Sequence, residues 1–463
     1  MLPGVTRESL LSGFHALPRP VQSAVRKAYR AIPFPYSQGL SFGRLHHAFW
    51  QSQHWSAERL EALQLEQLRR MAHHAYASVP AHRERFTAAG MKPEDIRSLD
   101  DWAALPVTAK PEVQDAPERF VSTAIPSEKL QTRSTSGSTG TPLVIYTTEH
   151  TQVAEAAMMY RGFRWAGYRP GDRIVTIVGE LTGEVHGPPH APYTRYGEHL
   201  DLSPHHLTEE GCASYLERMR AFGPAFLRTY PSIVQLLGKV MRDAGIERPP
   251  LLGIWTQSEI LYEAERELLE QLWQTRVFDY YGMQEKCVAM SECEHGRMHI
   301  NSEFGFVELL PSEHPGCAHI VATGFYNHAM PLLRYQTRDL AIIDGRRCPC
   351  RRALPTVSTI VGRVEDFLVA SDGSQVMEAD EAIADLTTIR ECQIVQESLT
   401  HTRVLVVPGP RYDHETETVL VGRLRGLLGA DVRLDVEKHA SIPRTGTGKQ
   451  RFIVSKVNAG WTL

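Results

Sequence analysis

Short apolar segments alternate with amphipathic segments through the middle of the chain. β-Branched and aromatic residues predict strands at residues 143–146, 173–178, 225–229, 251–255 and 277–281. Between them, apolar side chains recur at helical spacing over residues 151–166, 232–244 and 264–274. Strands separated by helices pair in parallel through right-handed crossovers, so we expect an α/β fold with ligands at the carboxyl ends of its strands.

The residue patterns near the two ends of the chain predict other elements. Apolar residues from Leu60 to Val79 predict a helix over 56–79, and residues 21–32 have a similar pattern. The 21–32 segment is either a membrane-surface helix or a helix docked on its own domain, and docking is the commoner use of such a pattern. The last hundred residues predict strands at 393–396 and 402–407, a helix at 416–428 and a glycine-rich loop at 444–449.

A chain of 463 residues exceeds the usual size of a single core, which predicts more than one domain. We place a large domain of helix-flanked β-sheets at residues 1–362, with a helical extension over about residues 1–55. A small, mobile α+β domain follows at residues 363–463, after the turn-like segment 362–366. Apolar residues at 42% and charged residues at 22% are typical of a globular protein.

Charge and cysteine content narrow the class of partner and compartment. A formal charge of −4 excludes a broad attraction to nucleic acid or to anionic membranes, so an anionic ligand must be held locally. No apolar run is long enough to span a bilayer, and we expect neither a signal peptide nor an integral membrane segment. Seven cysteines are too few for a disulfide scaffold, which favours the reducing cytoplasm. The sequence leaves open whether the protein is a monomer or a homodimer.

The strongest local signal is a loop of six hydroxyl residues and two glycines within residues 134–142, just before an apolar segment. Hydroxyls and exposed backbone N–H groups donate to phosphate oxygens, and glycine allows close approach. The spacing is not that of a Walker loop. A flexible linker is the alternative, but linkers rarely lead directly into a buried strand. The predicted phosphate-binding residues are Ser134, Thr135, Ser136, Gly137, Ser138, Thr139 and Gly140.

This loop resembles the phosphate-binding motif of the superfamily of acyl-CoA synthetases, peptide-synthetase adenylation domains and luciferases. Four further segments resemble its other motifs in the right order: residues 280–285, 334–339, 362–366 and 443–449. Residues 63–110 are most similar to the N-terminal region of the phenylacetate-CoA ligase and capsular-biosynthesis-type branch. The resemblance covers most of the chain from about residue 55 onward.

The resemblance implies roles for individual residues. Lys449 is the catalytic lysine, Glu285 binds Mg²⁺, and Gln284 stands where the family usually has a threonine that contacts phosphate. Asp339 and Arg363 hold the ribose, and Glu365 is the hinge about which the small domain rotates. The remaining predicted ATP contacts are Ser258, Glu259, Tyr280, Tyr281, Gly282 and Met283.

An acyl pocket is expected beside the nucleotide site. Glu180 and His186 lie in a glycine- and proline-rich loop, which we favour as a pocket wall over a second metal or acid–base site. By resemblance and by their position at strand ends, Tyr230, Ser232 and Trp255 are expected to line the same pocket.

Cysteine and histidine spacing predicts a separate metal centre. Cys293 and His299 precede Cys348 and Cys350 by about fifty residues, and four such ligands favour tetrahedral Zn²⁺ with no open position. His295 and Cys287 are rival ligands, and unliganded thiols are the alternative. Such a site would join the segment of Glu285 to that of Asp339.

We therefore expect an AMP-forming acid–thiol ligase. It would convert a carboxylic acid and Mg·ATP to an acyl-adenylate and pass the acyl group most simply to coenzyme A. The alternatives are transfer to an amine or to a carrier-protein thiol. From another class, the chain would be a non-catalytic nucleotide-binding or assembly protein. The sequence does not identify the acid.

Overall fold

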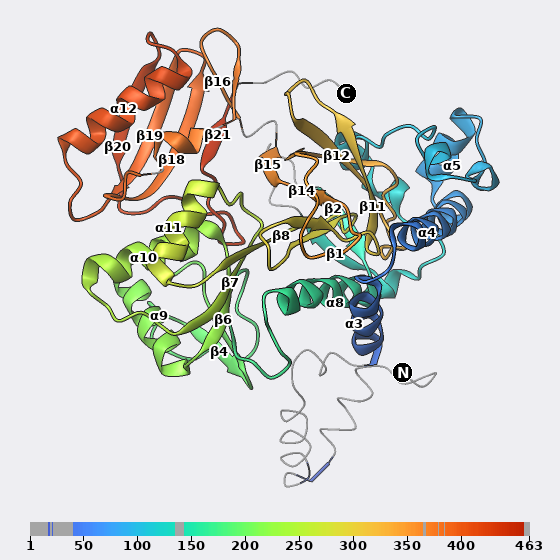
Figure 1. Ribbon diagram of the computed structural model, residues 1–463, viewed down its shortest axis with the longest axis horizontal. Helices are drawn as coiled ribbons and strands as arrows, with labels where there is room; N and C mark the ends of the chain where they lie inside the picture. Colours follow the sequence, from blue (N-terminus) through green and yellow to red (C-terminus); the bar gives the residue numbers. More distant parts are fainter. Residues whose placement is uncertain are drawn as a thin grey trace.

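The computed structural model describes residues 17, 18, 21, 40–134, 143–363, 367–377, 379–383 and 385–457. Residues 40–363 are called the N-terminal region here, and residues 367–457 the C-terminal region. Two sheets and their helices make up most of the N-terminal region, and a smaller sheet with one long helix makes up the C-terminal region (Figure 1).

A nine-stranded sheet runs through the N-terminal region. Its strands, in spatial order, are β14 (Thr356–Val357), β10 (Met298–Ile300), β9 (Ala289–Glu292), β8 (Val277–Gly282), β7 (Leu251–Gln257), β6 (Ala225–Thr229), β3 (Ile174–Ile177), β5 (His199–Leu202) and β4 (Tyr193–Tyr196). Pairing is parallel from β8 through β7, β6 and β3 to β5, and antiparallel at both ends. The predicted α/β fold is confirmed.

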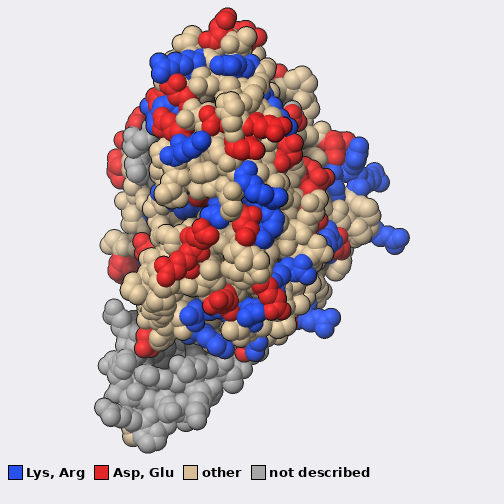
Figure 2. Space-filling model, turned by 90° about the vertical axis from the view of Figure 1, so that its left-hand side faces the viewer, with Lys and Arg blue, Asp and Glu red and all other residues tan. Residues whose placement is uncertain are grey.

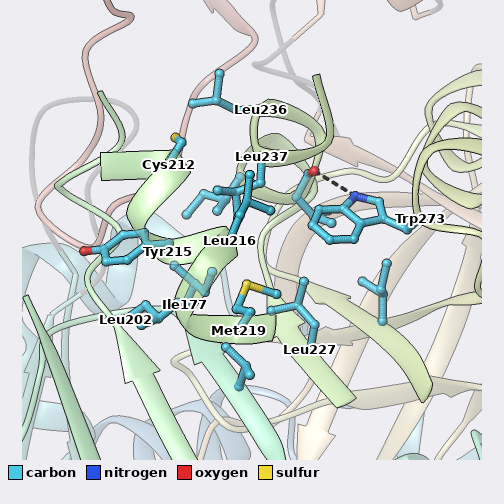
Figure 3. Close-up of a cluster of buried hydrophobic side chains, with 14 of the residues drawn as sticks. Ile177, Leu202, Cys212, Tyr215, Leu216, Met219, Leu227, Leu236, Leu237 and Trp273 are labelled. Carbon is cyan, nitrogen blue, oxygen red and sulfur yellow. Dashed lines mark hydrogen bonds between the residues drawn. The ribbon is translucent and has the colours of Figure 1, made fainter. Parts of the chain in front are cut away.

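Alternating residues send the strands' side chains into two cores. Leu227 of β6 faces a core shared with α9 (Glu209–Phe222), α10 (Pro231–Ala244) and α11 (Glu263–Trp273). In that core the indole of Trp273 donates to the carbonyl of Val234 at 3.1 Å (Figure 3). The neighbouring Phe226 faces the opposite core, formed with α8 (Glu149–Trp165) and α3 (Leu40–Ser52).

The helix expected near the start of the N-terminal region is found within a residue of its predicted bounds. The expected helix at 56–79 is α4 (Ala57–Ser78), whose Ser56 side chain caps it by accepting from the backbone N–H of Arg59. It packs with α5 (Pro80–Ala88) and α6 (Leu99–Trp102) in one core, whereas Val113 of α7 (Lys110–Asp115) lies in another. Of the expected helix at 21–32, only residue 21 lies within the described residues.

Two parts of the N-terminal region differ from the strand pattern expected from the sequence. The strand expected at 143–146 is β2 (Val144–Thr147), which pairs with β1 (Gln131–Ser134) outside the nine-stranded sheet. A second, antiparallel sheet contains β11 (Gly305–Pro311), β12 (Cys317–Gly324), β13 (Tyr335–Ile342) and β15 (Thr359–Arg363). Gly362 and Arg363, expected in a turn, therefore lie in a strand that pairs with β13.

The C-terminal region has its own sheet and core. The sheet contains β20 (Arg433–Lys438), β19 (His401–Pro408), β18 (Ile389–Ser398) and β21 (Ile453–Ser455), with the small pair β16 (Leu368–Val369) and β17 (Gln375–Val376) beside it. Helix α12 (His414–Leu428) covers one face through Leu420 and Leu424. The exact boundary at residue 362 stays a prediction, because residues 364–366, including Glu365, lie outside the described residues.

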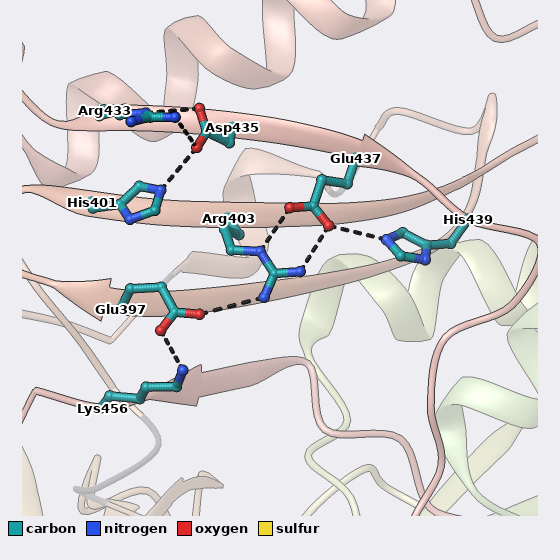
Figure 4. Close-up of polar contacts among 8 residues, drawn as sticks. All are labelled: Glu397, His401, Arg403, Arg433, Asp435, Glu437, His439 and Lys456. Carbon is teal, nitrogen blue, oxygen red and sulfur yellow. Dashed lines mark hydrogen bonds and ion pairs between the residues drawn. The ribbon is translucent and has the colours of Figure 1, made fainter.

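The other face of this sheet carries a row of charged side chains (Figure 4). Arg403 bridges Glu437 at 2.7 Å and Glu397 at 3.4 Å, and Glu397 also pairs with Lys456. On the face of the whole molecule drawn in Figure 2, acidic and basic residues are interspersed and neither sign forms a continuous field. Among the described residues, no helix is both long and apolar enough to cross a bilayer.

Candidate active site

A cavity of about 760 Å³ lies between the two regions. The N-terminal region contributes the carboxyl ends of β6, β7 and β8, the side of α8 and the facing ends of β13 and β15. The C-terminal region contributes the loop that carries Lys449. The predicted residues Ser258, Glu259, Tyr280, Tyr281, Gly282, Met283, Gln284, Glu285, Asp339, Arg363 and Lys449 all line this one cavity, as do Ser134 and Ser232.

Strand pairing brings Asp339 and Arg363 together. The two residues are direct partners in the β13–β15 register, and the guanidinium Nε of Arg363 lies 3.7 Å from one carboxylate oxygen of Asp339. The hydroxyl of Tyr281, from β8 of the other sheet, donates to the second oxygen at 2.6 Å. Burial, followed by the neighbouring Asp339, raises the pKa of Tyr281 well above its usual value, so the hydroxyl stays a donor. The carboxylate of Asp339 is thus fixed at the cavity wall.

Glu285 lies just after β8 and is buried to 2% exposure. The hydroxyl of Tyr335 donates to it at 3.3 Å. A tight turn, in which the backbone N–H of Lys286 donates to the carbonyl of Met283 at 3.1 Å, holds this segment. Gly324 of β12 packs closely behind it, since a Cβ there would lie 2.5 Å from the Lys286 carbonyl oxygen. Gln284 is exposed at the cavity.

Lys449 lies in a turn of the C-terminal region in which the backbone N–H of Gly448 donates to the carbonyl of Thr445 at 2.8 Å. Gly448 has φ +84°, and a Cβ there would lie 2.5 Å from Pro204, so the loop packs directly on the N-terminal region. The Lys449 ammonium lies 5.9 Å from the ring centre of Tyr230. Burial lowers the pKa of Lys449, against the opposing effect of Glu259 and Glu285.

Polar contacts hold this loop across the gap between the regions. Glu259 accepts from the backbone N–H of Gln450 at 2.7 Å and from the backbone and hydroxyl of Ser232, each at 3.1 Å. The Tyr230 hydroxyl donates to the carbonyl of Thr447 at 3.1 Å. Glu259, expected as an ATP contact, therefore joins the two regions here, and burial raises its pKa.

The phosphate-binding loop and the hinge cannot be placed in the same way. Ser134 is the last residue of β1 and is exposed at the cavity. Thr135, Ser136, Gly137, Ser138, Thr139 and Gly140 lie outside the described residues, as does Glu365.

The residues expected in the acyl pocket separate into three groups. Ser232 lines the cavity, and Tyr230 lies against Lys449. Trp255 does not line the cavity, because it stacks between Phe163 and Phe226 in the α8 core, with ring centres 3.6 and 4.6 Å away. Its side of β7 faces the helices. Glu180 and His186 are exposed on their loop and lie outside the cavity lining.

Several polar cavity residues were missed from the sequence, among them Glu155, Arg228 and Lys286. The ammonium of Lys286 lies 2.7 Å from both carboxylate oxygens of Glu155 on α8. The guanidinium Nε of Arg228 donates to Gln257 at 2.8 Å. Arg228 could have been noticed in the sequence, because it is a charged residue within the apolar strand 225–229.

The predicted metal ligands are brought together behind the cavity. The ligand atoms of Cys293, His299, Cys348 and Cys350 all lie within 4.8 Å of one another. The Cys293 and Cys348 sulfurs are 3.5 Å apart, and the Cys350 sulfur lies 3.3 Å from His299 Nε2. Tetrahedral ligands at about 2.3 Å from Zn²⁺ would be about 3.8 Å apart, so the group fits a closed site.

The surroundings of this group favour metal binding over loose thiols. His299 Nδ1 lies 3.3 Å from the carbonyl of Leu354, an arrangement that leaves Nε2 as the ligand atom. The rival Cys287 lies elsewhere, with its thiol 3.4 Å from Met283 sulfur. His295 contributes its backbone N–H to Cys293 sulfur at 3.4 Å and is not part of the group.

Comparison with known proteins agrees with this architecture. A family model described as the CapK C-terminal domain matches residues 368–456. Protein CapK of Staphylococcus aureus is 23% identical over 369 residues, covering 76% of this chain and 80% of the relative. A phenylacetate-coenzyme A ligase of Pseudomonas putida is 30% identical over 334 residues, covering 68% of this chain and 73% of the relative. The chain belongs to the phenylacetate-coenzyme A ligase family.

The fold of this family member is shared with a solved acyl-CoA ligase. A 2-hydroxyisobutyryl-CoA ligase, crystallised in the postadenylation state, matches with a TM-score of 0.68 at 19% identity, covering 87% of this chain and 91% of that one. The resemblance to adenylate-forming enzymes inferred from the five motifs is thereby confirmed. The chain is an AMP-forming acid–thiol ligase by family, with its motif residues gathered at one cavity.

Proposed function

We propose that this ligase activates a carboxylic acid with ATP as an acyl-adenylate and then transfers the acyl group to coenzyme A. The observation that carries the proposal is that Lys449, Glu285 and Asp339 line one cavity. Lys449 lies in a loop of the C-terminal region, Glu285 follows β8 and Asp339 lies in β13. The relatives are named as coenzyme A ligases for phenylacetate, which supports both the two-step reaction and the thiol acceptor.

In the first step, a carboxylate oxygen of the acid attacks the α-phosphorus of ATP. The bond from that phosphorus to the oxygen bridging to the β-phosphate breaks, and pyrophosphate leaves. Negative charge builds on the α-phosphate oxygens, and the Lys449 ammonium neutralises it. Asp339 and Arg363 hold the ribose hydroxyls and fix the nucleotide for attack.

Glu285 is the proposed ligand of Mg²⁺, which would supply positive charge to the phosphates. Its fit rests on the buried carboxylate at the cavity wall, close to the exposed Gln284. The loop 134–142 is proposed to donate to the same phosphates, with Ser134 at the cavity marking where it begins.

In the second step, a thiolate sulfur attacks the acyl carbonyl, the bond from that carbon to the phosphate oxygen breaks, and AMP leaves. We propose that the C-terminal region rotates about Glu365 between the steps. The contacts between the Lys449 loop and the N-terminal region support this proposal, because they are a small set of polar bonds that water can replace. Product analysis with coenzyme A, an amine or a carrier protein would distinguish the three acceptors.

The experiment that tests the function is acid-dependent exchange of labelled pyrophosphate into ATP, with a panel of carboxylic acids. Exchange that requires both an acid and Mg²⁺ is the expected result. Tight ATP binding without exchange under any acid would instead favour a non-catalytic nucleotide-binding protein. None of the seven cysteines, all of which lie in the described residues, forms a disulfide, which supports the proposed cytoplasmic location. Sedimentation would distinguish a monomer from a homodimer.

We also propose that Cys293, His299, Cys348 and Cys350 hold a structural Zn²⁺. Metal analysis is expected to find about one zinc per chain in the wild type, and none in Cys350→Ser, whose melting temperature should fall. Cys317→Ser is the matched control, because Cys317 lies outside the group of ligands. A wild-type protein purified without chelators and free of zinc would contradict the assignment.

A further inference from the structure

One end of the cavity contains a cation that the proposed reaction does not use. Across the nine-stranded sheet, β7 and then β6 lead away from β8, where Tyr281 contacts Asp339. Arg228 of β6 lies on the same side of the strand as Phe226, toward α8, and lines the cavity. It bonds to Gln257, which pairs with Tyr280 in the β7–β8 register, so Arg228 and Tyr280 flank one part of the cavity wall. The acyl group is assigned to this end because it lies across β7 and β8 from the pair Asp339 and Arg363.

The guanidinium of Arg228 donates to the side-chain oxygen of Gln257 at 2.8 Å. In the described part of the chain, no carboxylate forms an ion pair with it. Both oxygens of Glu155 contact Lys286. Asp201 of β5 interacts with Arg228 electrostatically, but it accepts its hydrogen bonds from hydroxyls such as those of Tyr196 and Thr176. A guanidinium at a cavity wall without an ion pair is suited to an anion from the ligand.

A second donor at the same end lacks a partner. The hydroxyl oxygen of Tyr280 is buried and forms no hydrogen bond among the described residues, although Tyr280 lines the cavity. A buried hydroxyl left unpaired is costly, which points to a ligand acceptor that satisfies it. Ala156 and Met159 of α8 supply apolar surface at the same wall.

We infer that the acid activated by this ligase carries a second oxyanion, most simply a second carboxylate, which binds Arg228 and accepts from the Tyr280 hydroxyl. The inference rests on the proposed function and names the substrate class of that site. An uncharged aryl or alkyl acid would leave the guanidinium and the hydroxyl without partners. A site built on buried polar donors discriminates strongly against a ligand that lacks the matching group.

The test compares short dicarboxylic acids with their monoamides, which keep the length and shape but lose the second charge. Succinate, glutarate and adipate are each measured against the corresponding monoamide by pyrophosphate release with the full chain. The wild type is expected to prefer a dicarboxylate over its monoamide by about 10- to 100-fold in kcat/KM, the range for a hydrogen bond to a charged group.

Three variants locate that preference. Arg228→Met is expected to reduce the preference ratio by about tenfold or more, and Arg228→Lys to reduce it less, because the charge remains. Tyr280→Phe should reduce it by about threefold to tenfold. Arg276→Met is the control, since Arg276 is exposed at the opposite end of β8 and contacts the Glu294 carbonyl. Its preference ratio should match that of the wild type.

Pyrophosphate release that favours monoamides, or a ratio unchanged in Arg228→Met, would overturn the inference and leave the proposed function intact. The wild-type ratio decides the matter even if a variant fails to fold. If neither series supports pyrophosphate release while another acid of the wider panel does, the inference is overturned and the proposed function stands. If no acid of that panel supports release, the proposed function is contradicted as well.

Discussion

The two sides of the cavity are held by different kinds of contact. On the N-terminal side, Asp339 and Glu285 lie on or beside strands, are almost fully buried and accept from tyrosine hydroxyls. On the C-terminal side, Lys449 belongs to a turn that reaches its place through contacts with Glu259 and Tyr230 across the gap. The acidic residues are therefore fixed when the sheets form. The lysine is positioned by the contacts between the two regions.

A second group of contacts supports the closed arrangement farther from the cavity. The Lys239 ammonium of α10 donates to the carbonyl of Ile389 at 2.8 Å, and Arg242 donates to the carbonyl of Thr387 at 3.0 Å. Arg390 of β18 lies 3.0 Å from Glu209 and 3.6 Å from Asp243. These polar contacts add to those at the cavity and join α10 and α9 to β18 and the segment just before it in the C-terminal region.

The largest expected effect is that of Lys449→Ala. Removing a preorganised charge from the reacting centre should slow acid-dependent pyrophosphate exchange by about 100-fold or more. The melting temperature should stay near that of the wild type, because Lys449 lies on a turn outside the C-terminal core. Lys456→Ala is the control, since Lys456 pairs with Glu397 on the charged face of Figure 4. Unchanged exchange in Lys449→Ala would contradict the assignment.

Asp339→Asn tests the fixed side of the comparison. The amide keeps the shape but loses the charge that faces Arg363, and only one of its two terminal atoms can still accept a hydrogen bond, so kcat/KM for ATP should fall by about 10- to 100-fold. Stability should also decrease, unlike in Lys449→Ala. Asp435→Asn, on the exposed row of Figure 4, is the matched control. A melting temperature unchanged in Asp339→Asn would show that the carboxylate is not part of the fixed wall.

The pH dependence of adenylation should reveal the Lys449 environment. Burial lowers the pKa of Lys449 from its usual value near 10.5, so its charged form is lost at a lower pH than in an exposed lysine. Exchange should therefore decline on the alkaline side below pH 10.5. Lys449→Arg keeps its charge at these pH values and should move the decline to higher pH. Identical alkaline limbs in the two proteins would assign the decline to another group.

The smallest effect is expected for Arg390→Gln, which weakens the contacts with Glu209 and Asp243. Adenylation should slow by no more than about fivefold, because Glu209 is largely exposed, where an ion pair contributes up to about 1 kcal/mol, and Asp243 keeps its contact with Arg242. Thioester formation from preformed acyl-adenylate should keep its rate. Equal slowing of both half-reactions would show that this contact does not favour the adenylation arrangement.

Individual residues show why sequence reasoning succeeded at some positions and failed at others. Strand 225–229 was placed to the residue, because its apolar run ends at a proline that begins α10. Trp255 was assigned to the wrong side of its strand, since alternation alone does not say which face meets the cavity. The sheet that pairs Asp339 with Arg363 was missed, because antiparallel pairing between distant segments leaves no local signal. Arg228 was missed for a related reason, because a single charge within an apolar strand does not reveal what lies opposite.

The sequence by itself determined the order of the motifs, the α/β class and the candidate identities of the catalytic lysine, the two carboxylates and the four metal ligands. The α/β class and the metal ligands follow from local composition and spacing, and the lysine and the carboxylates follow from motifs that resemble those of a known family. Both are properties of the sequence that do not depend on its folding. Only the tertiary structure decided which of them share a cavity, which are buried and paired, and that Arg228 lines that cavity without an ion pair beside the unpaired Tyr280 hydroxyl. Those properties depend on distances between segments far apart in the chain, and such distances are set by packing and strand register.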